Sequence, residues 1–518
     1  MEQRVSYKKA TMMVIIITLI SKVTGFLREI FLGSAYGATY VTDAYLVSLT
    51  IPQTLFSSIA AAITTTFIPL YSSIGVEGGR GEDVRFTNRV LNVVLVTSGT
   101  LAVLGMVFAR PIVSLIARGF EGEALEMATA FTRITFPMIV FIGICQVFIG
   151  YLQANGEFAL PALIGIPSNA VVIAMLLLSG GVGPYGLVLG TLAGAVIQAA
   201  MLLIGAYKRG YSYTGELNFR DPYVSKVIAL ALPVMMGSAV QQINVLIDRR
   251  LASGLPEGSI SALNFANKLN GFAYGLFTIS LATVIYPLLS RLSAEKDMAG
   301  FKEKLVKALN VITLIILPIT VGAIVLRRPI VSVLFERGQF DARATSMTAS
   351  ALMFYSLGMV FYGYRDVLNK TFYSLQDTKT PMINGMLTVA LNIMLNLILV
   401  KFMQHDGLAL ATSLSAMVMT VLLFANLRKR LRGIAGRKLV AGFLKCGVAS
   451  LIMGLAVYWL NGFAEEHIHS SSGLIDLLVL GAVIMIGAAL YFALVYVFKV
   501  EEVDWLVDMV KKRMKASR

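Results

Sequence analysis

Residues 110–114 read Arg-Pro-Ile-Val-Ser, and residues 328–332 repeat these five residues in the same order. An Arg-Gly pair follows each copy, at 118–119 and at 337–338. Further matches keep a similar separation: Pro69 with Pro287, and Gly186 with Gly407. All offsets lie between 218 and 223, so they define one alignment. The chain therefore contains two copies of a segment of about 220 residues.

The composition is that of a membrane protein. Of the 518 residues, 57% are apolar and only 14% are charged, and the mean hydropathy is +0.76. A soluble domain usually carries about 25% charged residues. The apolar residues form fourteen blocks, each long enough to cross a hydrocarbon core of about 30 Å. No loop between them exceeds about 20 residues, which leaves no room for a soluble catalytic domain.

The charge distribution predicts the topology. With the N-terminus in the cytoplasm, the loops and span ends on that side hold 28 Lys and Arg residues, and the opposite side holds 9. This excess satisfies the positive-inside rule and places both termini in the cytoplasm. Topology and anionic lipid headgroups also account for the net charge of +15, so we expect no nucleic-acid partner. The predicted spans are 10–32, 43–70, 90–109, 128–153, 160–179, 185–206, 224–248, 259–289, 306–326, 346–374, 380–400, 407–427, 439–460 and 474–498.

The repeat and the spans together predict an all-α polytopic protein with three parts. Residues 1–213 form an N-lobe of helices 1–6, and residues 214–432 form a C-lobe of helices 7–12. Residues 433–518 hold helices 13 and 14 and a cytoplasmic amphipathic tail. Because each copy has an even number of helices, both lobes have the same orientation, and transporters with such repeats bind substrate between the lobes. No filter-like loop interrupts a span, which favours alternating access over a channel.

Helix 1 carries two cations inside the membrane. At 1.5 Å per residue, Lys22 lies about 20 Å and Arg28 about 28 Å beyond the inner edge. A charge near the bilayer centre costs at least about 2.5–3.5 kcal/mol and normally faces protein or water. A straight helix points the two cations apart, but Gly25 between them permits a bend toward one cavity. Two alternatives stay open: an ion pair of Arg28 with Glu29 or Asp43, and snorkelling of Lys22.

Helix 8 places a further cation in the C-lobe. Asn264, Asn267 and Asn270 flank Lys268 at spacings of three and four, which we expect on one helical face. Such a face lines water more often than lipid. Cations from both lobes then converge on one cleft, where guanidinium and ammonium groups attract an anionic substrate such as a phosphate. Helix 10 adds charges that either line the cavity or form a local pair: Arg365, Asp366 and Lys370.

Oxygen-bearing side chains of the C-lobe indicate a candidate cation site. Asp248 ends helix 7, Asn392 and Asn396 lie one turn apart on helix 11, and Thr412 is in helix 12. Carboxylate, amide and hydroxyl oxygens are the ligands that a hard cation prefers. The alternatives are hydrogen bonds between helices and an ion pair of Asp248 with Arg249.

Other classes of site are not indicated. No Gly-Lys pair occurs, so the chain lacks the phosphate-binding loop of ATPases. Cys145 and Cys446 lie in apolar segments and do not frame a disulfide scaffold. We find no paired carboxylates and no nucleophile beside a base at one depth, so we expect no enzymatic activity.

The segments that hold these cations resemble a known family. Residues 21–29 (SKVTGFLRE), 37–38 (GA), 42–45 (TDAY) and Pro52 are similar to the lipid II flippases of the MurJ/MviN family, within the superfamily of multidrug extruders and oligosaccharide flippases. The similarity continues through 264–269 (NFANKL) and 372–381 (FYSLQDTKTP) and covers essentially the whole chain.

The resemblance implies a function and a set of site residues. The implied substrate is lipid II, the undecaprenyl-pyrophosphate-linked precursor of peptidoglycan, moved from the inner to the outer leaflet of a bacterial cytoplasmic membrane. We expect partners among membrane lipids and cell-wall synthesis proteins, and a monomeric chain. The expected substrate-binding residues are Lys22, Arg28, Lys268, Glu29, Asp43, Asn267 and Arg365. The residues that match a sodium site of some relatives are Asp248, Asn392, Asn396 and Thr412, which makes Na⁺ a candidate coupling ion.

The chain also departs from the family pattern. It has Lys at two cavity positions where Arg is typical, and Phe56 where Gram-negative members commonly have an arginine. Lysine keeps the charge but lacks the bidentate fork of arginine. The competing functions are a flippase for another polyprenyl-linked oligosaccharide (capsule or sporulation), a multidrug extruder and a non-transporting scaffold. A drug extruder favours cationic substrates, so the basic residues count against it.

Overall fold

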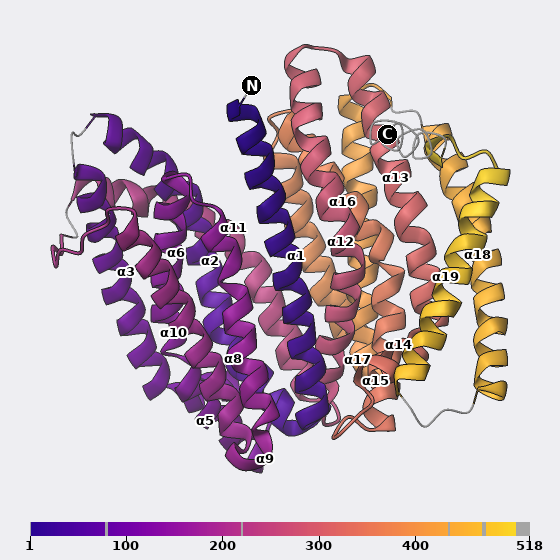
Figure 1. Ribbon diagram of the computed structural model, residues 1–518, viewed down its shortest axis with the longest axis horizontal. Helices are drawn as coiled ribbons and strands as arrows, with labels where there is room; N and C mark the ends of the chain where they lie inside the picture. Colours follow the sequence, from indigo (N-terminus) through magenta and orange to yellow (C-terminus); the bar gives the residue numbers. More distant parts are fainter. Residues whose placement is uncertain (1, 78–80, 219–220, 434–435, 469–472, 504–518) are drawn as a thin grey trace. The chain divides into compact units, whose positions relative to one another are not determined.

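The computed structural model describes residues 2–77, 81–218, 221–433, 436–468 and 473–503. Within these residues the chain forms nineteen α-helices and no β-strand. Figure 1 shows their arrangement within each part of the chain. An all-helical fold is expected inside a bilayer, because a helix satisfies its own backbone hydrogen bonds where water is absent. The chain divides into two compact units: Met1–Ser261 with Arg337–Phe340, and Ala262–Glu336 with Asp341–Arg518.

The first unit contains the helices up to α11. α1 and α2 are long, and α11 packs against α2 although its sequence belongs to the second repeat. Asp221 caps the N-terminus of α11 by accepting from the backbone N–H groups of Tyr223 and Val224. The helices are α1 (Glu2–Tyr36), α2 (Tyr40–Glu77), α3 (Glu82–Val107), α4 (Ala109–Ile116), α5 (Gly122–Thr135), α6 (Met138–Ala154), α7 (Ala159–Leu163), α8 (Gly165–Leu177), α9 (Ser179–Val182), α10 (Pro184–Lys208) and α11 (Pro222–Ser253).

The second unit contains most of α12 and all later helices. Aspartates again cap two of them: Asp297 accepts from the backbone of Gly300 in α13, and Asp341 from that of Ala344 in α15. The helices are α12 (Ser259–Ala294), α13 (Met298–Val325), α14 (Arg327–Phe335), α15 (Ala342–Leu357), α16 (Met359–Ser374), α17 (Lys379–Arg430), α18 (Gly436–His467) and α19 (Gly473–Val497).

Every predicted span lies on helix, but the breaks between helices differ from the prediction. Three spans consist of two helices each: α5 with α6, α7 with α8, and α15 with α16, the last pair bent by 43°. Conversely, predicted spans 11 and 12 share the 52-residue α17, which is interrupted only at Gln404 (φ 51°, ψ −130°). By length and hydropathy, the described residues contain eight segments that are able to cross a membrane, or nine with the bent α15–α16 pair, when α5–α6 and α7–α8 each count as one segment.

The structure also shows the internal repeat. The two Arg-Pro-Ile-Val-Ser motifs form the short helices α4 and α14, where the spans alone predicted loops. Each unit has an ion pair at matching positions: Glu157 with Arg209 in the first, and Asp377 with Arg430 in the second. In both copies the acidic residue precedes a membrane helix and also accepts hydrogen bonds from the backbone N–H groups at its start.

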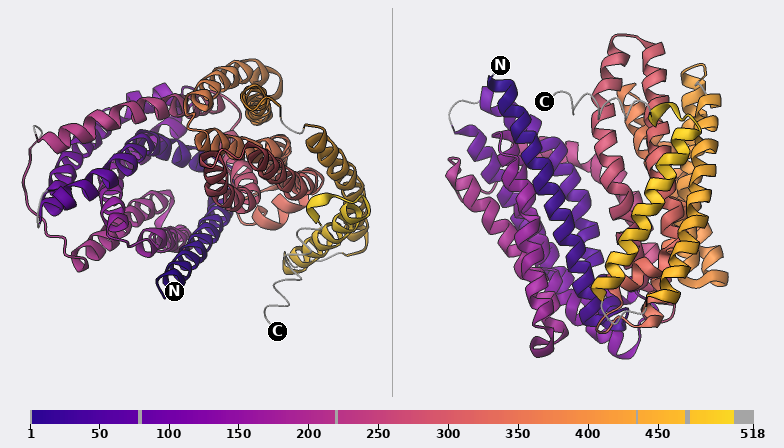
Figure 2. Two further views of the ribbon diagram at one scale, coloured as in Figure 1. Left: turned by 90° about the horizontal axis from the view of Figure 1, so that it is seen from above. Right: turned by 45° about the vertical axis from the view of Figure 1, so that its right-hand side comes forward.

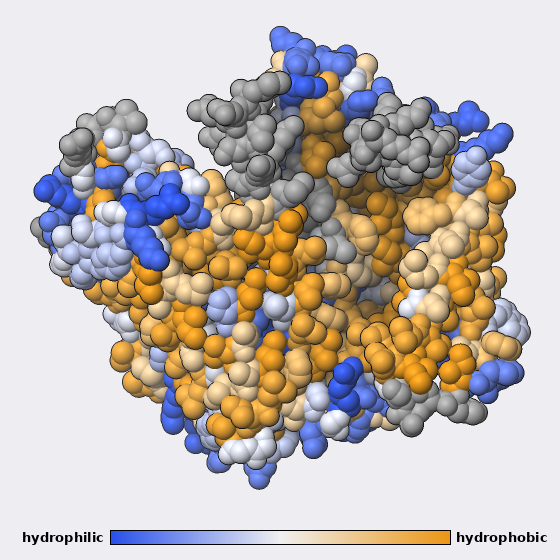
Figure 3. Space-filling model, in the orientation of Figure 1, coloured by the Kyte–Doolittle hydropathy of each residue, from blue (hydrophilic) through white to orange (hydrophobic). Residues whose placement is uncertain are grey.

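Each unit has its own core. In the first, Phe67, Phe86 and Phe148 are buried between α2, α3, α6 and α10. In the second, α18 and α19 lie side by side (Figures 1 and 2) and pack on α13, where Tyr491 donates a hydrogen bond to the carbonyl of Leu314 at 2.9 Å. Hydrophobic residues cover the middle of the face seen in Figure 3, and hydrophilic residues gather at its ends, as expected for a lipid-facing surface.

Candidate functional site

Arg28 is the centre of a polar cluster on α1. Its Nη2 atom donates to Glu29 Oε1 at 2.7 Å, and its Nη1 atom donates to Asn169 Oδ1 at 3.2 Å. The Arg28 side chain is 30% exposed, whereas the Glu29 side chain is only 5% exposed. Of the two alternatives for this arginine, the structure shows the pair with Glu29 and not the pair with Asp43. The pair reduces the cost of placing charge inside the membrane.

Asn169 on α8 is a residue that the sequence analysis missed. Its Nδ2 atom donates to Thr24 Oγ1 at 3.2 Å and to the carbonyl of Ser21 at 3.5 Å, so the amide bridges α8 to two turns of α1. The sequence did contain a signal for this role, since an asparagine within an apolar span commonly supplies hydrogen bonds between helices. The amide could not be assigned to Arg28 without knowing that α1 and α8 are neighbours.

Helix α1 does not break at Gly25. α1 continues as one helix from Glu2 to Tyr36, and Gly25 lies against Asn169 instead, with room for the amide beside its Cα. Lys22 is exposed and has no ion pair with any described residue. Six residues correspond to about 240° of helical rotation, so Lys22 and Arg28 occupy different faces of this helix.

Asp43 caps the start of α12, whose first residues belong to the first unit. Its carboxylate accepts from the backbone N–H groups of Gly258 and Ser261, both at 2.8 Å, and from the Ser261 hydroxyl. Gly258 directly precedes α12 and Ser261 lies in its first turn, where unsatisfied N–H groups favour an anion. Asp43 is 4% exposed and all these contacts are within the protein. The structure thus gives Asp43 a structural contact in addition to its predicted place among the substrate-binding residues.

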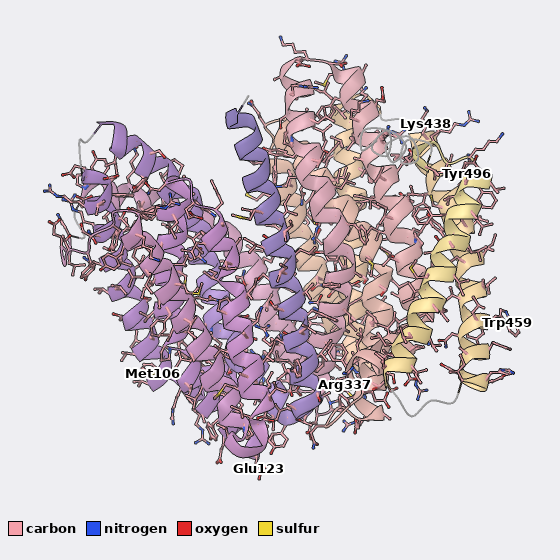
Figure 4. All side chains as sticks on the ribbon, viewed as in Figure 1. Met106, Glu123, Arg337, Lys438, Trp459 and Tyr496 are labelled. Atoms are coloured by element: carbon pink, nitrogen blue, oxygen red, sulfur yellow. The ribbon has the colours of Figure 1, made fainter. Side chains whose placement is uncertain are left out.

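Backbone segments approach closely around this cap. Gly37, Gly258 and Gly338 all have positive φ angles, of 60°, 85° and 61°. A Cβ atom on Gly258 would lie 2.2 Å from the carbonyl oxygen of Ala38, and one on Gly338 would lie 2.2 Å from that of Ser34. Residues 337–340, with Arg337 labelled in Figure 4, thereby pack on the end of α1. Only glycine combines these backbone angles with this proximity.

The polar residues near Lys268 do not share one face. Asn267 and Lys268 are exposed on α12 and Asn264 is half-buried, but Asn270 is 2% exposed. The spacing of three residues predicted that Asn270 lies on the same face as Asn267. Side chains three residues apart on a helix still point about 60° apart, and this difference is enough to turn Asn270 into the buried face. Asn267 and Lys268 remain neighbours on an accessible surface of α12.

Arg365 forms a local ion pair with Asp366, which is one of the two alternatives that the sequence allowed for these charges. Its Nη2 atom lies 3.2 Å from Asp366 Oδ1, and its guanidinium lies 5.6 Å from the ring centroid of Tyr362. Both charged side chains are about one-third exposed. Lys370, one turn later, has its ammonium 5.3 Å from the ring centroid of Tyr286, an attractive arrangement for a cation.

The predicted cation-site residues fall in different units. Asp248 lies on α11 in the first unit, and the other three lie on α17 in the second. Asn396 Nδ2 donates to Asn392 Oδ1 at 3.0 Å, and Thr412 donates to the carbonyl of Leu408 at 2.9 Å. An amide oxygen accepts more than one hydrogen bond or ligand contact, so the donor set suits a hard cation such as Na⁺. The four-residue site remains a prediction. In the part of the chain that the structure describes, no three His, Cys, Asp or Glu side chains group as a metal site.

Sequence comparison connects this arrangement to known proteins. The family model described as lipid II flippase MurJ matches residues 32–478. A Vibrio cholerae protein named probable lipid II flippase MurJ is 31% identical over 476 residues, which cover 87% of this chain and 88% of that protein. A Rickettsia prowazekii protein of the same name is 28% identical over 498 residues, covering 94% and 97%.

Solved structures show the same relationship. A structure of the lipid II flippase MurJ in an inward closed conformation matches with a TM-score of 0.81 at 27% identity, covering 94% of this chain and 98% of that one. An inward-facing multidrug transporter of the MATE family matches with a TM-score of 0.67 at 14% identity, covering 81% and 98%, which indicates a similar fold only. The chain is a multi-pass membrane protein and belongs to the MurJ family of lipid II flippases.

Proposed function

We propose that this chain moves lipid II from the inner to the outer leaflet of a bacterial cytoplasmic membrane by alternating access. Membership of the MurJ family supports this substrate, since the family model is described as lipid II flippase MurJ and the relatives of Vibrio cholerae and Rickettsia prowazekii are named probable lipid II flippase MurJ. Both termini lie in the cytoplasm in this proposal, because Lys and Arg concentrate on that side.

The observation that carries the proposal is the state of Arg28. A guanidinium has five N–H donors, and the contacts to Glu29 and Asn169 use two of them. The side chain is still 30% exposed, within a helix that begins its membrane passage with the apolar stretch 12–20. An arginine at this depth faces water or a polar ligand in preference to lipid. The remaining N–H groups suit the oxygens of a diphosphate.

Glu29 and Asn169 position the guanidinium in this proposal. Their oxygens fix two edges of the planar group, so little side-chain freedom remains to be lost when a phosphate binds. The carboxylate also balances the charge of Arg28 when no substrate is bound. Lys22 and the Asn267–Lys268 pair supply further exposed polar groups for the headgroup.

The energy source follows from the charge of the substrate. The membrane potential favours outward movement of negative charge by about 2.3 kcal/mol per charge per 100 mV. The oxygen ligands Asn392, Asn396 and Thr412, with Asp248, are the proposed Na⁺ site that couples the return step. In this proposal the headgroup binds at Arg28 independently of the Na⁺ site.

The test is a comparison of substrates in vesicles that contain the purified protein. A fluorescent lipid II and a polyprenyl-pyrophosphate oligosaccharide with a different glycan are reconstituted in parallel, and leaflet accessibility is followed with an impermeant quencher. We expect translocation of lipid II and not of the second lipid. Equal transport of both would favour a general oligosaccharide flippase, and transport of neither would reject the proposed function.

A further inference from the structure

A second polar site lies in the second unit and is lined by none of the candidate site residues discussed so far. A cavity of about 500 Å³ opens between the start of α13, the start of α18 and the residues that follow α19. Lys438, at its edge, is labelled in Figure 4 at the end of α18 opposite Trp459. The residues that line the cavity are Ala299, Lys302, Glu303, Val306, Lys307, Asn310, Lys438, Glu501 and Glu502.

The repeat identifies the counterpart of this cavity in the first unit. With the offset of 218 that relates the two Arg-Pro-Ile-Val-Ser motifs, Asn310 corresponds to Asn92 and Lys307 corresponds to Arg89. Asn92 Nδ2 donates to the carbonyl of Glu216 at 2.7 Å, and Asn92 Oδ1 accepts from the Tyr213 hydroxyl at 3.0 Å. A segment that follows α10 therefore covers this position in the first unit.

Charge complementarity accompanies this contact in the first unit. Arg89 forms ion pairs with Asp221 at 2.8 Å and with Glu216 at 3.5 Å. Thus a cation and an amide on α3 hold an acidic segment of the chain against the helix. The same pair of positions on α13, occupied by Lys307 and Asn310, lines the cavity in the second unit.

In the second unit the asparagine of α13 bonds to an acidic side chain and not to a backbone carbonyl. Asn310 Nδ2 donates to Glu502 Oε1 at 2.7 Å, and both residues are buried. Glu303 pairs with Lys304 at 2.8 Å, and Glu501 lies 3.7 Å from Lys438. Glu303 and Glu501 thus have lysine partners and Glu502 has an amide partner, while Lys302 forms no ion pair with any residue between 2 and 503 that the structure describes. The lining holds three lysines and three glutamates, so its formal charge is zero, and Lys302 is a cation of the lining that remains available to an external anion.

The surroundings of the cavity indicate where such an anion comes from. Lys438 begins an apolar stripe on α18 in which Val440, Leu444 and Leu451 are each at least 60% exposed. Exposed apolar residues on a membrane helix face acyl chains. In the proposed topology this end of α13 and α18 lies on the cytoplasmic side, where lysines between membrane helices bind lipid headgroups.

We propose that this cavity binds the phosphodiester headgroup of an anionic phospholipid of the inner leaflet. Lys302, Lys307 and Lys438 contact the phosphate, and the acyl chains lie along the exposed stripe of α18. The C-terminal residues 504–518 do not suit the cavity, because five of them are Lys or Arg and only two are acidic. The site is separate from Arg28 and does not depend on the identity of the transported lipid.

The test measures binding of short-chain phosphatidylglycerol to the purified full-length protein in detergent. Short-chain phosphatidylcholine is the zwitterionic comparison, and glycerol phosphate tests for a soluble ligand. The variant Lys302→Gln with Lys307→Gln removes two cavity cations, and Lys379→Gln with Lys429→Gln removes two exposed lysines of the same unit. Ala299→Trp, at the exposed rim, blocks the cavity without changing a charge.

We expect the wild-type protein to bind phosphatidylglycerol in preference to the other two ligands. The cavity variant should bind it about 30-fold more weakly, the control variant should resemble the wild type, and Ala299→Trp should also lose binding. Equal binding of the two lipids, equal binding of free glycerol phosphate, or an unchanged affinity in the cavity variant would overturn the proposal. Preferential binding of an acidic peptide with the sequence of residues 211–221 would also overturn it, in favour of a protein partner.

Discussion

Arg28 and Asn169 are 141 positions apart in the chain and are joined by a hydrogen bond of 3.2 Å between Nη1 and Oδ1. The same asparagine holds α1 through Thr24, so one amide fixes both the helix and its cation. Asn169→Ala should therefore lower lipid II transport more than stability. We expect a cost of about 1 kcal/mol in stability, typical of a hydrogen bond between membrane helices. Thermal unfolding and leaflet accessibility in the same preparation measure the two effects.

A matched control for this asparagine is Asn461→Ala. Asn461 bonds to Glu465 on the exposed surface of α18, so its loss should change neither transport nor stability measurably. If Asn169→Ala transported lipid II at the wild-type rate, Asn169 would have no role in positioning Arg28.

The cap that Asp43 provides to α12 predicts a coupled loss of stability. Asp43→Asn keeps the shape but replaces one acceptor oxygen with an N–H₂ group that faces backbone donors. We expect a loss of about 1–3 kcal/mol, because a buried donor then lacks its partner. Ser261→Ala removes one contact only and should cost about 1 kcal/mol. In a double-mutant cycle the two changes should be non-additive, and additive losses would contradict the shared contact.

The close approach at Gly258 gives a test with an internal control. Gly258→Ala adds a Cβ atom 2.2 Å from the carbonyl oxygen of Ala38 at a φ of 85°. Gly210 has nearly the same φ, 88°, but a Cβ atom added there would have no neighbouring atom within 4 Å. Gly210→Ala should cost about 1–2 kcal/mol from backbone strain alone. Gly258→Ala should lower the Tm clearly further, and equal Tm values for the two variants would show that the contact with Ala38 has no effect.

Asp377 predicts a dependence of stability on pH. Partial burial raises its pKa, but hydrogen bonds from Thr380 and the nearby charge of Arg430 outweigh this, so the pKa lies below its ordinary value. A carboxylate with a lowered pKa in the folded state stabilises the protein above the unfolded pKa of about 3.9 and loses this contribution as the pH falls through the folded pKa. The Tm difference between the wild type and Asp377→Asn should therefore be largest near pH 6 and shrink below pH 4. A difference that is constant from pH 6 to pH 3 would contradict this assignment.

The sequence predicted the fold well because the bilayer imposes simple rules. Apolar blocks of sufficient length must be helical, and the repeat shows which of them correspond. The breaks between helices were harder to predict: the motif at Arg110 and its copy at Arg328 form short helices, and Gln404 alone interrupts α17. Such breaks depend on single backbone conformations, which hydropathy does not encode.

The candidate site was predicted less completely, because its contacts join distant segments. Arg28 and Glu29 were identified by their charge in an apolar helix, and their pairing was one of the stated alternatives. Asn169 was missed because its role depends on the packing of α8 against α1. Asp43 was recognised as important, but its cap on α12 depends on a tertiary contact across 218 positions.

The most direct measurement is the rate of lipid II translocation by Arg28→Ala in reconstituted vesicles, beside Arg28→Lys and the surface control Arg85→Ala. Arg85 forms an exposed pair with Glu82, so its removal changes only a surface contact. We expect Arg28→Ala to abolish transport, Arg28→Lys to retain part of it because the charge remains without the fork, and Arg85→Ala to resemble the wild type. Wild-type transport by Arg28→Ala, with the protein folded and correctly inserted, would contradict a role for this guanidinium in carrying the headgroup.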